Sequence, residues 1–193
     1  MKLSKDYWQA RYDNSETGWD IGSVSTPLKE YIDKLTDTSI KILIPGCGNA
    51  YEAAYLYAKG FENTFLVDFA EAPLNSFRNK FPDFPKGQLI CDDFFNLVGK
   101  FDLIVEQTFF CALDPILRNE YCRKMAELLT PNGQLVGLLF NQIFEKEGPP
   151  FGGTIEEYTN KLSQHLKIQS LEICNNSITP RAGKELFMIC SGK

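Results

Sequence analysis

Short runs of apolar residues alternate with amphipathic stretches along most of the chain. Runs of this kind, bounded by glycine, proline and polar residues, are typical of β-strands. Five strands are predicted on this basis: Ile40–Ile44, Thr64–Asp68, Gln88–Cys91, Phe101–Val105 and Gln134–Phe140. Helices are predicted between them at Ala50–Lys59, Ala70–Lys80 and Pro115–Leu129. Because the strands are continuously hydrophobic rather than alternating, the pattern indicates a parallel sheet with helices on both faces.

The alternation of strands and helices stops near the end of the chain. Two strand-like runs follow one another closely there, Lys167–Cys174 and Lys184–Cys190. The segment between them, Asn175–Gly183, is shorter than the dozen or so residues that a parallel crossover usually needs. The pair is therefore predicted to be antiparallel. The fold class predicted is α/β, a doubly wound seven-stranded sheet that is mostly parallel with one antiparallel strand.

Two further helices, Ser4–Tyr12 and Thr26–Leu35, are predicted before the first strand. They flank an aromatic, glycine-containing segment, Gly18–Gly22. We expect residues 1–37 to form an N-terminal helical lid over the sheet. A chain of 193 residues leaves no room for a second independent core, so residues 1–193 are predicted to be a single domain.

Composition and charge narrow the class of protein. Hydrophobic residues make up 44% and charged residues 23% of the chain, as in ordinary globular proteins. The net charge is −5, the wrong sign for attracting nucleic acid or an anionic membrane. The N-terminus is polar where a secretory signal would be apolar, and no apolar run approaches the length of a membrane span. We expect a cytoplasmic protein, monomer or weak dimer, whose partner is a small molecule.

The six cysteines are scattered without a Cys-x-x-Cys pair, and His165 is the only histidine. This pattern predicts reduced thiols that mostly fill the core, and no metal site. His165 lies late in a polar helical pattern, which indicates a solvated surface position rather than a catalytic one.

The segment Ile40–Ala50 contains a strand, a Gly46-x-Gly48 turn and the start of a helix. Glycine lets such a turn bend sharply and lets the backbone approach a ligand, although the same pair also occurs in a merely tight turn. Asp68 ends the next strand, where a carboxylate can accept hydrogen bonds from both hydroxyls of a ribose. The alternative for Asp68 is an ordinary helix N-cap.

The glycine turn also limits the kind of nucleotide. Tyr51 stands where a dinucleotide site needs a small residue, and no Gly-Lys-Ser/Thr sequence follows, which excludes a P-loop. The ligand predicted contains ribose but no phosphate, and S-adenosylmethionine fits this description. Asp93, with Asp92, offers a carboxylate for an adenine amino group, and Phe94 an aromatic wall. An aspartate that caps a turn before core phenylalanines is the alternative.

Several short motifs occur in one order along nearly the whole chain. They are Tyr7-Trp8-x-x-Arg11-Tyr12, Thr17-Gly18-Trp19-Asp20-x-Gly22, Pro45-Gly46-Cys47-Gly48, Asp93-Phe94-Phe95, Glu106-Gln107-Thr108-Phe109-Phe110-Cys111-Ala112-Leu113, Arg118, Gly148-Pro149-Pro150-Phe151 and Arg181-x-Gly183-Lys184-Glu185. Each motif is weak alone, but the order is specific. The chain resembles class I S-adenosylmethionine-dependent methyltransferases, which have a Rossmann-like fold, and more closely the thiopurine methyltransferase family with its plant thiocyanate and halide methyltransferase branch.

The resemblance implies that Trp8, Tyr12 and Trp19 fold over the cofactor, with Trp19 also in the substrate pocket, although Trp8 on composition alone fits a core position equally well. It also implies a cofactor-binding role for Glu106, at a position where the plant branch has Asp. Phe151 stands where we expect Tyr, so the anion preference of that branch does not carry over directly.

For the methyl acceptor, Phe109, Phe110 and Phe151 are predicted to join Trp19 in excluding water, and Arg118 is predicted to attract an anion. A surface position on a helix is the alternative for Arg118. A thiol, sulfide, thiocyanate or halide acceptor needs no acid or base from the protein, since positioning in a desolvated pocket suffices. No catalytic acid or base is therefore predicted.

Other functions stay open at this stage. They include a methyltransferase for another small molecule or for a protein, and a non-catalytic module that binds S-adenosylmethionine. A nicotinamide-dependent enzyme of the same fold class is a more distant alternative.

Overall fold

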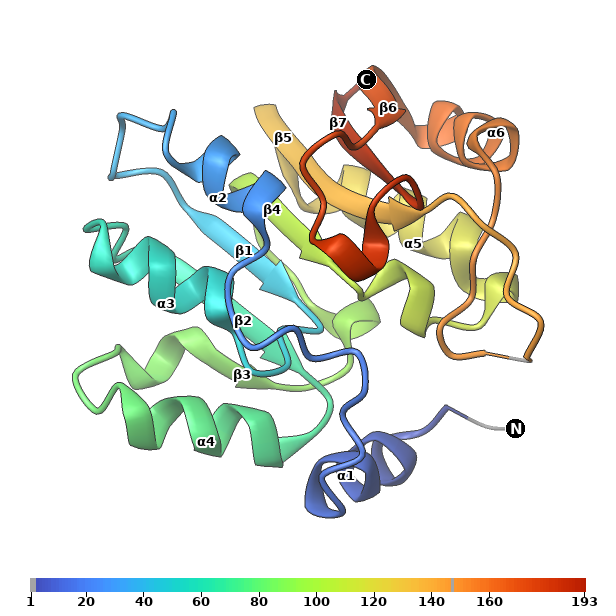
Figure 1. Cartoon of the computed structure of the whole chain (residues 1–193). Helices are drawn as coiled ribbons and strands as arrows, with labels where there is room; N and C mark the ends of the chain where they lie inside the picture. Colours follow the sequence, from blue (N-terminus) through green and yellow to red (C-terminus); the bar gives the residue numbers. More distant parts are fainter. Residues whose placement is uncertain (1–2, 147) are drawn as a thin grey trace.

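The computed structural model describes residues 3–146 and 148–193, and its centre is a seven-stranded sheet (Figure 1). The strands lie in the order β3-β2-β1-β4-β5-β7-β6. Their bounds are Ile42–Pro45 (β1), Thr64–Asp68 (β2), Leu89–Cys91 (β3), Phe101–Gln107 (β4), Leu129–Phe140 (β5), Leu166–Ile173 (β6) and Glu185–Gly192 (β7). All neighbours are parallel except β7, which runs antiparallel to both β5 and β6. The predicted fold class is confirmed, including its one reversed strand.

The described residues form six α-helices together with short 3-10 turns. The helices are α1 (Lys5–Asp13), α2 (Thr26–Ile32), α3 (Tyr51–Ala58), α4 (Glu71–Lys80), α5 (Arg118–Leu128) and α6 (Ile155–His165). The predicted helix Pro115–Leu129 begins as a 3-10 turn, because the side chain of Asp114 accepts a hydrogen bond from the N–H of Ile116. It ends one residue early because Leu129 is extended and pairs with Phe101 of β4.

Two hydrophobic clusters, one on each face, hold the helices on the sheet. Leu28 of α2, Leu56 of α3 and Phe77 of α4 belong to one cluster. Met125 of α5 and Leu162 of α6 belong to the other. Both faces of the sheet are therefore covered, as the continuous hydrophobicity of the strands predicts.

The strand order places a crevice above β1 and β4. From β1 the chain winds outward through β2 and β3, then returns to place β4 on the other side of β1. At such a reversal the connections leave the strands in opposite directions, and open α/β sheets bind ligands there, beyond the carboxyl ends of the strands. Pro45, Asp68 and Gln107, the last residues of β1, β2 and β4, consequently face one common region.

Among the described residues, no helix combines the length and apolar character needed to cross a membrane. Within the same residues, no group of three or more His, Cys, Asp or Glu side chains is arranged to hold a metal ion. The six cysteines are unpaired there; Cys91 is exposed and the other five are buried. His165 is half-buried rather than fully solvated as the sequence predicts.

Candidate active site

A cavity of about 1190 Å³ lies where β1, β2 and β4 end, between the sheet and the N-terminal segment. This volume somewhat exceeds the range of about 300–1,000 Å³ that is usual for small-molecule sites, so the cavity has room for more than one small ligand. Residues that line it come from α1, the glycine turn, the ends of β2 and β4, the loop after β5 and the loop before β7. One site therefore joins segments from both ends of the chain.

The turn between β1 and α3 is strongly bent, with φ values of 55° at Gly46 and 51° at Gly48. This left-handed conformation favours glycine. Space requires glycine as well, because a Cβ at Gly46 would lie 2.7 Å from Cγ of Phe109 and one at Gly48 would lie 3.0 Å from the hydroxyl of Tyr12. The turn thus brings bare backbone to the cavity and leaves room for aromatic side chains above it.

Asp68 fixes the glycine turn from the end of β2. Its Oδ2 accepts a hydrogen bond from the N–H of Gly48 at 3.0 Å, and its Oδ1 accepts one from the N–H of Ala70 at 2.9 Å. Burial raises the pKa of the Asp68 carboxyl, while these backbone N–H groups lower it. Asp68 is not the N-cap of α4, since that position belongs to Ala70. The helix-cap interpretation is therefore wrong, and the carboxylate lines the cavity.

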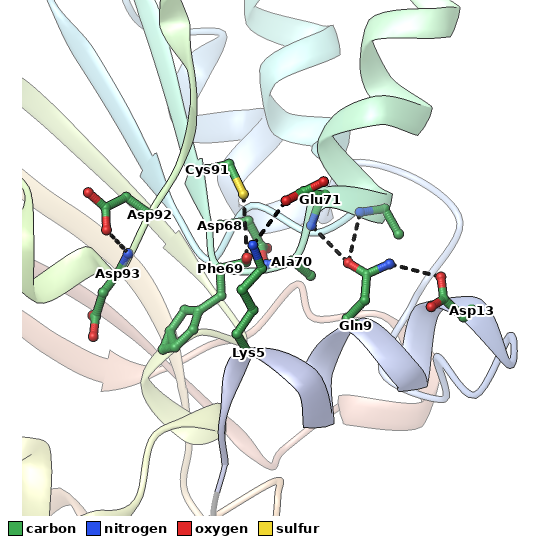
Figure 2. Close-up of polar contacts among 11 residues, drawn as sticks. Lys5, Gln9, Asp13, Asp68, Phe69, Ala70, Glu71, Cys91, Asp92 and Asp93 are labelled. Carbon is green, nitrogen blue, oxygen red and sulfur yellow. Dashed lines mark hydrogen bonds and ion pairs between the residues drawn. The ribbon is translucent and has the colours of Figure 1, made fainter.

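Gln9 of α1 supplies the missing cap of α4 from another part of the chain (Figure 2). Its Oε1 accepts hydrogen bonds from the N–H groups of Glu71 at 2.9 Å and Ala72 at 3.2 Å. Lys5, one turn earlier in α1, forms an exposed ion pair of 3.0 Å with Glu71. These contacts hold α1 at the edge of the cavity, beside Asp68 (Figure 2).

Trp8, Tyr12 and Trp19 line the cavity from the N-terminal segment. The ring of Trp19 packs edge-on against Trp8 at 5.5 Å and against Tyr12 at 5.7 Å between centroids. Burial raises the pKa of the Tyr12 hydroxyl, and the charge of Asp68 raises it further. The phenol is therefore neutral, and the three rings form an apolar wall with hydrogen-bonding edges.

Two polar anchors attach this aromatic segment to the rest of the site. Asp20 accepts hydrogen bonds from the side-chain amide of Asn49 and, at 3.2 Å, from the hydroxyl of Tyr51, both just after the glycine turn. Arg181, in the loop before β7, donates to the carbonyl oxygen of Trp19 at 2.8 Å. Sequence reasoning missed Gln9, Asp20 and Arg181 as anchors, because their partners are far away in the chain.

Asp93 and Phe94 also line the cavity, after β3. The Asp93 carboxylate accepts a hydrogen bond from the N–H of Phe95 at 2.9 Å, so the capping role left open from the sequence is present. Phe94 is buried and its ring packs edge-on against Phe109 at 5.1 Å. Phe109 in turn is 8% exposed and lines the cavity beside the glycine turn.

Beyond Phe109 the cavity wall is largely apolar, with positive charge at one side. Apolar residues lining this part are Leu113, Leu117, Phe140, Phe144, Pro149 and Pro150. Arg181 and Lys184 line it as well. The Arg181 guanidinium is held by Glu185 at 3.2 Å and lies over the ring of Phe140, 5.3 Å from its centroid.

Some predicted site residues do not line the cavity. Arg118 is only 2% exposed, and its guanidinium donates to Glu157 and to the carbonyl oxygens of Phe151 and Gly152. The predicted role in anion attraction is wrong, because every one of these partners lies outside the cavity. The surface-helix alternative is wrong too. Arg118 instead fastens the loop before α6 to α5.

Phe151 and Glu106 are two others. Phe151 is not among the residues that line the cavity, although its N–H donates to the carbonyl oxygen of Cys111, which does line it, at 2.7 Å; its predicted role in the pocket wall stays a prediction. Glu106 is completely buried behind the cavity wall. Its Oε1 accepts hydrogen bonds from the N–H groups of Phe109 and Phe110, so direct cofactor binding is also wrong for this residue.

The sequence profile of the family described as Thiopurine S-methyltransferase (TPMT) matches residues 3–188. Thiocyanate methyltransferase 1 of Arabidopsis thaliana is 30% identical over 190 residues, covering 92% of this chain and 81% of that protein. Probable thiol methyltransferase 2 of Arabidopsis thaliana is 28% identical, with the same coverage. Thiopurine S-methyltransferase of Psychrobacter cryohalolentis is 26% identical, in an alignment that covers 88% of this chain and 89% of that protein.

Solved structures share the fold at lower identity. The 1,6-didemethyltoxoflavin-N1-methyltransferase of Burkholderia thailandensis, solved with S-adenosylhomocysteine bound, has a TM-score of 0.76 and 17% identity, covering 98% of this chain and 86% of that one. A TehB-like methyltransferase of Corynebacterium glutamicum has a TM-score of 0.67 and 18% identity, covering 98% of both chains.

Proposed function

The chain belongs to the thiopurine S-methyltransferase family, and we propose that it is an S-adenosylmethionine-dependent methyltransferase that acts on a small soft nucleophile: a thiol, sulfide, thiocyanate or halide. The observation that carries the proposal is the meeting of the Gly46–Gly48 turn, Asp68 and the Trp8–Tyr12–Trp19 wall in one cavity. S-adenosylmethionine, when bound, supplies a methyl group activated by a positively charged sulfur.

The residues present fit this cofactor. The glycine turn leaves a cradle that a Cβ would fill, and Asp68 offers a carboxylate to ribose hydroxyls while it holds that turn. Asp93 and Phe94 suit an adenine, the carboxylate for its amino group and the ring for its face. We therefore assign the cofactor to Trp8, Tyr12, Trp19, Gly46, Gly48, Asp68, Asp93 and Phe94.

Catalysis rests on positioning in this proposal. Phe109 and Trp19 exclude water from the reacting atoms, and the anchored aromatic segment acts as a lid, formed by the part of residues 1–37 that the structure describes. An acceptor that arrives as an anion needs only alignment with the methyl group in a desolvated pocket. Lys184 provides positive charge that favours such an acceptor, whereas the charge of Arg181 is already paired with Glu185.

A screen with a labelled methyl donor tests the proposal. Small thiols, sulfide, thiocyanate and iodide are offered separately, beside an amine and an alcohol of similar size. We expect label transfer to at least one of the soft nucleophiles. Transfer only to the amine or the alcohol would favour a methyltransferase of other chemistry. Binding of S-adenosylhomocysteine with no transfer to any acceptor would favour a non-catalytic binding module.

The cellular location and assembly also belong to this proposal. Five buried, unpaired cysteines suit a reducing compartment, which supports a cytoplasmic location. We also propose a monomer or weak dimer, because one chain supplies the glycine turn, Asp68 and the aromatic wall of the cavity described above.

A further inference from the structure

Glu106 is a charged side chain whose place in the interior is not explained by stability. It is 0% exposed near the end of β4 and does not line the cavity. Its Oε1 accepts two backbone hydrogen bonds, while its Oε2 is buried without a partner. A buried carboxylate with unused acceptors is less favourable for folding than a well-packed apolar side chain. A role other than stability is therefore indicated.

The carboxylate closes a strained turn. Between Glu106 and Phe109 the chain passes through Thr108 at φ 59°, a conformation unfavourable for a β-branched residue. The hydrogen bonds to Oε1, 2.8 Å from the N–H of Phe109 and 2.9 Å from that of Phe110, hold the backbone in this shape. Thr108 lines the cavity, so the strain lies in the cavity wall itself.

The same turn sets the position of an aromatic ring against the glycine turn. Phe109 follows Thr108, and its ring occupies the space where a Cβ at Gly46 would be, 2.7 Å from Cγ. The ring of Phe94 packs edge-on against the Phe109 ring. The location of Phe109 relative to Gly46 therefore depends on the hydrogen bonds that Glu106 makes.

The neighbouring strand leaves room for this carboxylate. Gly137 of β5 is paired with Glu106 of β4 in the sheet. A Cβ at Gly137 would lie 2.8 Å from the carbonyl oxygen, 2.9 Å from the Cβ and 3.0 Å from Oε2 of Glu106. Glycine at this position in the middle of a strand is thus explained by the close approach of both the backbone and the side chain of Glu106.

We propose that Glu106 is a positioning residue for methyl transfer, which acts by holding the 106–110 turn so that Thr108 and Phe109 are aligned with the glycine turn. It touches neither cofactor nor acceptor. The inference deepens the proposed function and rests on it, because alignment matters only where a methyl group is transferred.

Charged and titratable groups face Glu106 from several elements. They are Glu185 of β7 with its partner Arg181, Cys111 of the following turn, Tyr121 of α5 and Tyr158 of α6. Burial raises the pKa values of the Cys111 thiol and both phenols, so these three stay neutral near pH 7.

Burial also raises the pKa of Glu106 to about 7, against the lowering effect of the two backbone N–H groups. An ionised carboxylate accepts hydrogen bonds more strongly than a neutral one. The hold on the turn should therefore tighten as the pH rises through neutrality.

A pH titration of the amide protons of Phe109 and Phe110 by NMR tests the contact without requiring activity. In the wild type we expect both resonances to move together with an apparent pKa near 7, because their acceptor ionises. In Glu106→Gln neither should move over this range. Wild-type resonances that stay fixed from about pH 3.5 to 8.5, a range that also covers the ionisation of an unshifted glutamate, would overturn the proposal.

Kinetics with iodide, whose charge is independent of pH, test the consequence. Wild-type kcat should rise through neutrality and level off, whereas Glu106→Gln should be flat and about tenfold lower at pH 8. The Kd for S-adenosylhomocysteine should change by less than about threefold, since Glu106 does not touch the cofactor. An unchanged kcat in Glu106→Gln, or losses of kcat and affinity in equal measure, would leave Glu106 a merely structural residue.

Further variants control these results. Gly137→Ala retains the carboxylate but crowds both it and the backbone of Glu106, so kcat should fall while a pH dependence persists. Glu106→Asp, which keeps a carboxylate on a shorter side chain, serves if Glu106→Gln does not fold. Glu127→Gln makes the same chemical change on the exposed side of α5 and should leave kcat and its pH profile as in the wild type. If the wild type methylates no acceptor, the proposed function fails, while the amide titration still decides whether Glu106 holds the turn.

Discussion

The carboxylate of Asp68 and the backbone N–H of Gly48 are joined by a hydrogen bond of 3.0 Å, so that the end of β2 and the glycine turn after β1 form one unit. The second carboxylate oxygen is attached to Ala70, at the start of α4. A single side chain thus sets the spacing between two segments of the cavity wall. Any ligand bound there meets a carboxylate whose position is already fixed.

Replacing Asp68 by Ala should weaken S-adenosylhomocysteine binding by about 1.5–3 kcal/mol, because charged hydrogen bonds to the ribose are lost. Stability should fall as well, since the N–H groups of Gly48 and Ala70 lose their acceptor. Titration calorimetry measures the affinity and thermal unfolding the stability. Asp68→Asn, which keeps one acceptor oxygen, is the matched variant and should lose less of both. A stability loss with unchanged affinity would remove Asp68 from the binding site.

Gly46→Ala and Gly183→Ala separate backbone strain from crowding. Both glycines have positive φ, 55° and 73°, so each substitution should cost about 1–2 kcal/mol of stability from the conformation alone. A Cβ at Gly46 would collide with the ring of Phe109, whereas nothing lies within 4 Å of a Cβ at Gly183. We therefore expect Gly46→Ala alone to abolish cofactor binding in calorimetry. Equal effects of both substitutions would contradict the packing of Phe109 on the turn.

Arg118→Ala should reduce stability by about 2–3 kcal/mol, because the two loop carbonyls lose their donor and Phe110 and Tyr158 lose a packing partner. The partner carboxylate of Glu157 is partly exposed, so its loss of an ion pair adds little. Urea unfolding provides the measurement. For an anionic acceptor the KM should stay within about twofold at a temperature where the variant is folded. A large rise in KM with no loss of stability would instead support a role for Arg118 in binding the acceptor.

Gln9→Ala should weaken the docking of α1, because the N–H groups of Glu71 and Ala72 lose their shared acceptor. The cost of a lost helix cap is about 1 kcal/mol. Hydrogen exchange should show faster exchange of these two amides, and S-adenosylhomocysteine should restore part of the protection if α1 closes over the cofactor. Lys5→Ala, which removes only an exposed ion pair, is the control and should change little. Exchange unaltered in Gln9→Ala would contradict the cap.

The pH dependence of stability gives a separate test of Glu106. Its pKa is about 7 in the folded chain, above the ordinary value, so the folded state binds the proton more tightly and the carboxyl lowers stability as the pH rises. This loss starts near pH 4.3 and amounts to about 2–4 kcal/mol above pH 7. Urea unfolding should therefore show Glu106→Gln gaining on the wild type between pH 5 and pH 8. Identical pH profiles for the two proteins would contradict the raised pKa.

Much of the fold could be predicted because its signals are local. The continuous hydrophobicity of the strands indicates their burial, and the short Asn175–Gly183 connection forces the antiparallel pair. The five extra residues of β5 before Gln134 were not predictable, since the polar stretch after Leu129 joins the sheet only through pairing irregularities with β4.

Some residues of the site could be predicted from local signals and others could not. Gly46, Gly48 and Asp68 were predictable, because they stand at strand ends and because a sharp turn there needs glycine. Arg118 was not, because its partners are loop carbonyls and a carboxylate some 39 residues along the chain. The role of Glu106 was predicted incorrectly for a related reason. Its partners are the backbone N–H groups of Phe109 and Phe110, and a sequence pattern does not indicate which side chain accepts hydrogen bonds from backbone groups.

The position of β7 bears on how the chain can assemble. β7 is the last strand along the chain, yet it lies between β5 and β6. During synthesis, β6 is made before it has any neighbour to pair with, and the far edge of β5 stays open until residues 185–192 have emerged. The half of the sheet that contains Glu185 can therefore close only after residues 185–192 have been synthesised. A nascent chain stopped before β7 would leave one edge of β5 and both edges of β6 unpaired, and would depend on chaperones to avoid aggregation.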